Sequence, residues 1–137
     1  MSFFEIFDIA GSAMSAETVR LNVTASNLAN AQSVGGSEDT TYHARHPVFS
    51  AVMKSLQGDG ATYGVEVTDI VESQAPLEQR YQPGHPMANE EGYIFLPNVN
   101  MVDEMANMIS ASRAYQSNVE VVNTSKQLLM ATLRLGQ

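Results

Sequence analysis

Apolar residues recur every seven positions at both ends of the chain, and this spacing constrains the fold more than any other feature. The N-terminal row is Phe7, Met14, Leu21 and Leu28. The C-terminal region carries two rows, one of Met101, Met108, Tyr115, Val122 and Leu129 and one, offset by four, of Met105, Ser112, Val119, Lys126 and Leu133. An apolar residue at every seventh position, repeated several times, is typical of long helices that pack against other long helices. We therefore expect these helices to pack on one another and on neighbouring chains, and so to build an assembly.

Proline and glycine divide the 137 residues into three segments. All five prolines lie between Pro47 and Pro97, and seven of the nine glycines lie between Gly35 and Gly92. Both residue types disfavour helix interiors. We expect an N-terminal assembly helix within 1–33, a small β-rich middle region at 34–97 and a C-terminal assembly helix within 98–137. The predicted fold class is α+β, with the two long helices forming a coiled-coil-like pair that flanks the middle region.

Local patterns predict the individual elements. One helix is expected over 3–31. Apolar runs, alternation and turn residues predict four strands, at 42–53, 65–71, 77–82 and 93–96. The first strand carries Pro47 near its start or on a sheet edge, Pro76 is expected to end the second, and turns are expected at 57–61 and 83–86. The last helix should begin after Asn100 as N-cap, with two acids in its first turn, and stop at Gly136.

The net charge of −8 is unevenly distributed. The middle region has nine acidic and three basic residues, which give it −6, whereas the terminal segments carry −2 and 0. The two near-neutral helices can therefore pack against copies of themselves without strong repulsion. Clustered Lys and Arg, which nucleic-acid binding requires, are lacking, so we expect no nucleic-acid partner.

Several classes of protein are excluded by what the sequence lacks. The chain has no cysteine, so disulfides and thiolate metal sites are ruled out. No run of residues is apolar enough for a membrane span, and we expect no direct membrane insertion. The first residues lack the pattern of a cleaved secretory signal. A protein of this kind that leaves the cytoplasm is expected to do so without cleavage.

The three histidines offer the best case for an enzyme, and it is a weak one. His43 and His46 are three residues apart, a spacing that suits a metal on a helix, but this segment reads as extended, where the two side chains point to opposite faces. His85 lies in a predicted turn. The adjacent acids of the chain are not arranged for acid–base chemistry. We therefore expect no catalytic residue, no metal and no cofactor.

The segment Arg113–Asn118 has two interpretations. Its large polar side chains, which accompany Tyr115, would form an exposed helix face or would fix the register between subunits by hydrogen bonds. Such bonds would matter because two helices that carry only an apolar repeat of seven can shift past one another by seven residues and still pack.

Several motifs resemble the bacterial flagellar axial proteins. The N-terminal signature that rod, hook and hook-associated subunits share is matched by Leu21-Asn22-Val23-Thr24-Ala25-Ser26-Asn27-Leu28-Ala29-Asn30-Ala31. Within that group the chain is similar to the proximal-rod family, in the segments 4–13, 70–76, 92–93, 96–99, 110–121 and 132–137. The similarity runs from end to end at the family's usual length. It departs at 43–47 and around 58–62, which concerns local strand boundaries.

The resemblance implies a structural subunit of the proximal rod in the flagellar basal body. Such a subunit is exported through the flagellar type III apparatus without signal cleavage and stacks in the periplasm, where its terminal helices enclose the export channel and transmit torque. Its partners would be copies of itself, other rod subunits and the adaptor next to the MS ring. The resemblance also places Asn27 and Asn30 in the assembly interface.

The expected interface combines the apolar rows with these asparagines and the register segment. Its members are Phe7, Met14, Leu21, Asn27, Leu28, Asn30, Met101, Met105, Met108, Arg113, Tyr115, Val119, Val122, Leu129 and Leu133. The alternatives are another rod- or hook-type axial subunit, a helical adaptor protein, and a metalloenzyme that uses the three histidines.

Overall fold

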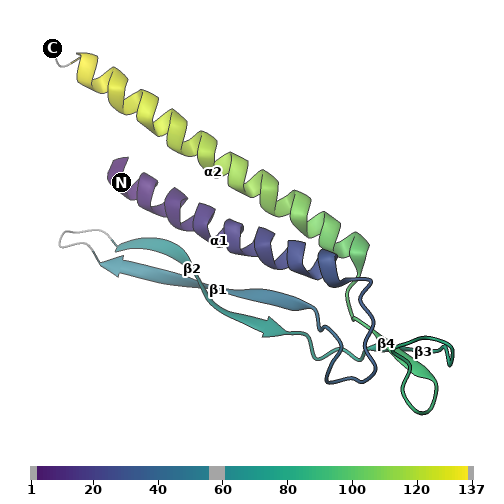
Figure 1. Ribbon diagram of the computed structural model, residues 1–137. Helices are drawn as coiled ribbons and strands as arrows, with labels where there is room; N and C mark the ends of the chain where they lie inside the picture. Colours follow the sequence, from purple (N-terminus) through teal and green to yellow (C-terminus); the bar gives the residue numbers. More distant parts are fainter. Residues whose placement is uncertain (1–2, 56–60, 136–137) are drawn as a thin grey trace.

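The computed structural model describes residues 3–55 and 61–135 and confirms the α+β class. A helix, α1 (Phe3–Asn30), is followed by strands β1 (Arg45–Ser55), β2 (Ala61–Glu72), β3 (Glu78–Tyr81) and β4 (Tyr93–Leu96), and then by helix α2 (Met101–Leu135). Figure 1 shows three layers, with α1 between α2 on one side and the β1–β2 hairpin on the other. Among the described residues, α2 does not contact the strands.

The two helices are antiparallel, and they differ in length. The first residues of α2 lie beside the end of α1, where Gln32 Nε2 lies 3.9 Å from Met101 Sδ and Arg20 donates to Asn107 Oδ1 at 3.2 Å. Since α2 has 35 residues and α1 has 28, the end of α2 extends past the start of α1 (Figure 1). The excess corresponds to about 10 Å of helix.

The strands form two separate two-stranded sheets rather than one. β1 and β2 pair from Arg45↔Glu72 to Ser55↔Ala61, with a bulge between Val48 and Phe49. β3 and β4 pair at the end of the molecule where α1 ends and α2 begins (Figure 1). Gly35 adds a bridge to Phe95, so the loop after α1 is tied to this second sheet.

Most element boundaries follow the sequence prediction. β4 covers the predicted 93–96, and Asn100 caps α2 by accepting hydrogen bonds at Oδ1 from the backbone N–H groups of Val102 (3.0 Å) and Asp103 (3.4 Å). β2 is longer than predicted at its start, and it ends at Glu72 rather than at Pro76. The Ser73 N–H still donates to Ala44 O at 2.7 Å, one residue past the end of β2. Of the turn predicted at 57–61, residues 57–60 lie outside the described residues, as does the stop at Gly136, and Ala61 is the first residue of β2.

The core consists mainly of small side chains. The buried apolar residues are Ala10, Ala16, Val23, Ala44, Ile94 and Ala111. On α2 the buried residues are Glu104, Ala111 and Ser125, which keep the seven-residue spacing but in a row other than the two predicted ones. Small residues allow two helix backbones to approach closely. The large apolar residues of α2 therefore lie beside or away from the contact with α1.

Candidate assembly interface

The outward side of α2 is an exposed apolar surface. Its exposed large apolar residues are Met101, Val102, Met105, Ile109, Tyr115, Val121, Leu128, Met130, Leu133 and Leu135, here named the α2 outer face. They extend over the whole helix, and several expose more than half of their surface, for example Val102 (73%) and Leu133 (61%). Exposed apolar surface of this extent is typical of a surface that another protein covers.

The predicted interface residues are distributed between the inside and the outside of the helix pair. Met101, Met105, Tyr115 and Leu133 belong to the α2 outer face, and Arg113 is exposed beside them. Eight residues of the predicted rows are half-buried, as is Asn30. The eight are Met108, Val119, Val122 and Leu129 on α2 and Phe7, Met14, Leu21 and Leu28 on α1. One predicted residue, Asn27, is fully buried.

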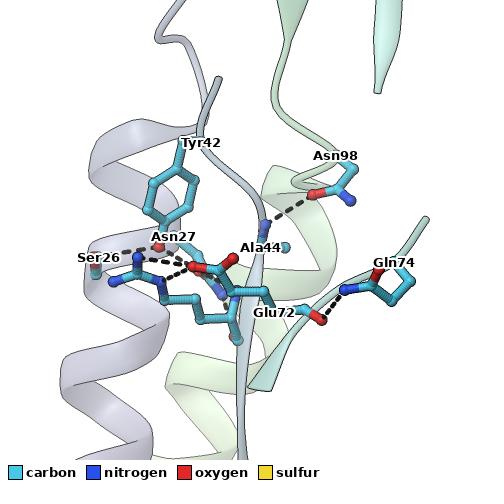
Figure 2. Close-up of polar contacts among 8 residues, drawn as sticks. Ser26, Asn27, Tyr42, Ala44, Glu72, Gln74 and Asn98 are labelled. Atoms are coloured by element: carbon cyan, nitrogen blue, oxygen red, sulfur yellow. Dashed lines mark hydrogen bonds and ion pairs between the residues drawn. The ribbon is translucent and has the colours of Figure 1, made fainter. Parts of the chain in front are cut away.

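Asn27 binds three parts of the chain at once. Its Nδ2 group donates to Arg45 O (2.8 Å) and to Glu104 Oε2 (3.1 Å). Its Oδ1 accepts from the Tyr42 hydroxyl (2.8 Å) and from Arg45 N (2.9 Å), as part of the polar cluster in Figure 2. All four hydrogen-bonding positions of the amide are occupied, and the side chain has 0% exposure. Asn27 thus joins α1 to the start of β1 and to the first turn of α2.

A second asparagine joins the loops near the start of α2. Asn98 Oδ1 accepts from Ala44 N at 2.8 Å, and its Nδ2 donates to Ala75 O at 2.7 Å (Figure 2 shows the bond to Ala44). An ion pair between Arg45 and Glu72 joins the first residue of β1 to the last residue of β2, with Nη2 and Oε1 2.9 Å apart. Together these bonds act at the open end of the hairpin, where β1 begins and β2 ends.

Sequence reasoning missed part of this arrangement. Glu104 was expected to supply first-turn charge, yet it is buried at 5% exposure and binds Asn27. At Tyr42 and Asn98 the sequence shows only a polar residue next to an apolar run. That pattern does not predict the hydrogen bonds that these side chains form. Because Glu104, Ala111 and Ser125 are spaced by seven and then by fourteen residues, a search for a repeat of seven that included small and polar residues would have found the buried row.

The histidines do not come together. His43 and His85 are half-buried and His46 is exposed, and His85 Nδ1 accepts from Met87 N at 3.1 Å within its own turn. Within residues 3–55 and 61–135, no three His, Cys, Asp or Glu side chains are grouped as metal ligands would be. Neither helix, over the residues described, combines the length and apolar character that crossing a membrane requires.

A helix pair with a polar interior bond and an apolar outer face defines a structural subunit of a helical assembly. Comparison with known proteins agrees. Residues 7–35 match the family model of flagella basal body rod proteins, and residues 90–135 match the C-terminal model of the flagellar basal body rod FlgEFG proteins.

Full-length relatives make the assignment specific. The chain is 52% identical to the flagellar basal-body rod protein FlgC of Escherichia coli O6:H1 and 51% identical to FlgC of Salmonella typhimurium, in both cases over 100% of each chain. It is 42% identical to FlgC of Buchnera aphidicola from Acyrthosiphon pisum, again over the whole of both chains. The chain belongs to the FlgC family of flagellar basal-body rod proteins, which are structural proteins and not enzymes.

Proposed function

We propose that this rod subunit polymerises through its terminal helices, with the α2 outer face as the principal contact surface. The observation that carries the proposal is the exposure of ten large apolar side chains on one helix. In the isolated chain α2 is covered on one side only, by α1. Burying apolar surface stabilises an assembly by about 25 cal/mol for each Å² removed from water.

The partners are copies of the chain, other rod subunits and the adaptor next to the MS ring. The subunit is made in the cytoplasm, passes through the flagellar type III export apparatus without signal cleavage, and joins the rod in the periplasm. In the rod, the packed terminal helices enclose the export channel and transmit torque. The family assignment supports this proposal, as does the absence of acidic or basic excess in residues 98–137.

The proposal divides the chain by role. Residues 1–33 and 98–137 form the assembly helices, and residues 34–97 form a β-rich middle that braces them. The assembly surface draws on the apolar rows, with Asn27 holding the subunit in shape from inside and Asn30 at the end of α1. Asn30 Nδ2 donates to Ser26 O at 2.8 Å, which keeps its side chain close to the last turn.

The decisive experiment places a charge in the middle of the α2 outer face. Ile109 is 54% exposed, so Ile109→Asp leaves the free energy of unfolding of the monomer unchanged to within about 0.5 kcal/mol. In the rod the same carboxylate would be buried without a partner, which is strongly unfavourable. We expect at least a tenfold loss of the chain from purified basal bodies and loss of motility, while the variant is still exported.

The control is Gln79→Asp, which introduces the same charge at an exposed position of β3. It should assemble as the unaltered chain does. Normal incorporation of Ile109→Asp would show that the α2 outer face is not a packed surface of the rod.

A further inference from the structure

A groove lies between α1 and the β1–β2 hairpin, on the side of α1 away from α2. Its volume is about 470 Å³. We name it the hairpin groove, and its lining residues are Ser12, Ser15, Ala16, Val19, Val52, Gly64, Val65, Glu66 and Val67. The lining is mostly small or apolar, so an apolar side chain would fit it better than water does.

A hydrogen bond between two lining residues joins α1 to β2 at the groove. Ser12 Oγ accepts from Val65 N at 3.2 Å and donates to Ile9 O at 2.8 Å. A Cβ at Gly64 would lie 3.1 Å from Ser12 Oγ, which is closer than most contacts of this kind. Glycine at this position therefore lets β2 approach α1 while the groove beside it stays open.

The hairpin has an apolar face on the side away from α1. A Cβ at Gly64 would point at Ser12 of α1, and the neighbouring strand residues point to the opposite face. The pairs Phe49↔Val67, Ala51↔Val65 and Met53↔Tyr63 place six apolar residues on one face, because directly opposed residues share a face. Val65 and Val67 also contribute to the lining of the groove. Phe49 is 42% exposed, and Met53 and Tyr63 are each 58% exposed. The hairpin thus leaves apolar surface uncovered on its side away from α1, in addition to the groove on its α1 side.

The same chain carries a surface of matching character at the end of α2. We name residues 126–135 the α2 tip; it includes the part of α2 that extends past α1. Leu128 and Leu133 are 54% and 61% exposed. Lys126 and Arg134 flank a shallow hollow with Met130, and neither side chain forms an ion pair within the described part of the chain. The tip is apolar with two free positive charges.

The charges of the two surfaces are complementary. Glu66 lines the hairpin groove, is exposed, and has no ion pair among the residues described. Opposite charges at the rim of an interface favour the correct partner and register. The tip cannot fill the groove of its own chain, because α1 lies between α2 and the hairpin (Figure 1).

We propose that the α2 tip of one copy binds in the hairpin groove of a second copy. This inference rests on the proposed function, in which the chain polymerises within the rod. Groove and tip are different surfaces, so the contact is head-to-tail and repeats without closing on itself unless the rotation between copies makes a ring. The geometry suits an open, axially growing structure.

The test uses engineered cysteines, because the chain has none of its own. Ser15→Cys places a thiol at the groove, since Ser15 lines it from α1 and is exposed, and Leu133→Cys places one on the tip. Basal bodies isolated from cells that make the doubly substituted chain are oxidised, and non-reducing gels are probed for this chain. We expect dimers and higher multimers, with a cross-linked fraction at least tenfold above that of either single variant.

Three comparisons make the result specific. Gln79→Cys combined with Leu133→Cys should give no multimers, because Gln79 lies on β3, outside the groove. Co-expression of the two single variants should give dimers and nothing larger. Dimers from Leu133→Cys alone would mean that tips contact tips, and would overturn the proposal.

Failure of the inference and failure of the proposed function have different signatures. Basal bodies that contain the doubly substituted chain but no cross-links overturn the inference and leave the rod function intact. Absence of the unaltered chain from basal bodies would contradict the rod function itself.

A charge exchange decides the matter if the cysteine variant does not enter the basal body. In competition with the unaltered chain, Glu66→Lys should lower incorporation about threefold, the range expected for one exposed ion pair. Adding Lys126→Glu to Glu66→Lys should restore incorporation. A combined variant that assembles no better than Glu66→Lys alone would overturn the proposal.

Discussion

The two long helices carry the same seven-residue repeat, yet one is the interior of the subunit and the other its exterior. α1 is covered by α2 on one side and by the hairpin on the other, and among its described residues only Phe4 is a large apolar side chain with high exposure. α2 has ten such residues. The repeat therefore predicts that a helix packs along its length, and the position of the helix in the layered fold decides what it packs against.

The difference also concerns the kind of residue that is buried. Within α1 the buried set includes Thr24 and Asn27, and α2 contributes Glu104 and Ser125. Asn27, which has all four hydrogen-bonding positions occupied and binds Glu104 of α2, specifies one register of the two helices. The exposed apolar residues of α2 instead allow contact with other chains. The subunit thus separates the surface that defines its own shape from the surface that we propose to bind neighbours.

The largest expected effect breaks the interior bond. Asn27→Ala removes four hydrogen bonds and leaves the carboxyl group of Glu104 and both backbone groups of Arg45 without their partner. We expect the free energy of unfolding of the monomer to fall by about 3 kcal/mol, measured by urea denaturation. Asn22→Ala, at an exposed position of the same helix, is the control and should change it by less than about 0.5 kcal/mol. Equal values for the two variants would show that the interior bond does not hold the fold.

A smaller effect tests the close approach of the helices. Ala111 has 0% exposure, and Ala111→Leu would force extra methyl groups between α1 and α2. We expect a loss of about 1–3 kcal/mol in the free energy of unfolding, together with a lower melting temperature. Ala106→Leu adds the same side chain at an exposed position of α2 and should leave the monomer's stability nearly unchanged. If Ala111→Leu and Ala106→Leu have the same melting temperature, the helices do not pack through their small residues.

The smallest effect on stability should come with a clear effect on assembly. Met105 is 54% exposed, so Met105→Ala should change the free energy of unfolding by less than about 0.5 kcal/mol but reduce incorporation into basal bodies. Val23, with 8% exposure, is the interior counterpart, and Val23→Ala should cost roughly 2 kcal/mol. Similar stability losses for the two variants would contradict the division into interior and exterior helices.

Boundaries set by local chemistry could be predicted from the sequence. β4 lies between Gly92, whose φ of 84° is in the left-handed region that favours glycine, and Pro97, which cannot continue a ladder. A Cβ at Gly92 would also lie 2.9 Å from the Tyr81 ring, which packs edge-on against Tyr93. The cap at Asn100 likewise depends on neighbouring residues only.

Features that depend on distant residues could not be predicted in the same way. The four strands form two separate sheets, and the segment between β2 and β3 is held by Asn98, which donates to the backbone carbonyls of Ser73 and Ala75. The buried row of α2 depends on its distance from α1, which the small side chain of Ala111 permits. Large apolar residues gave the correct period but not the correct face, because the face that carries them is turned away from the chain itself.

The position of the two asparagines has a mechanical consequence. Asn27 and Asn98 both act at the end of the molecule where α1 stops, β1 starts, β2 leaves and α2 begins. A twisting load on α2 therefore reaches the hairpin by side-chain bonds between adjacent segments, without first stretching the loops that join them.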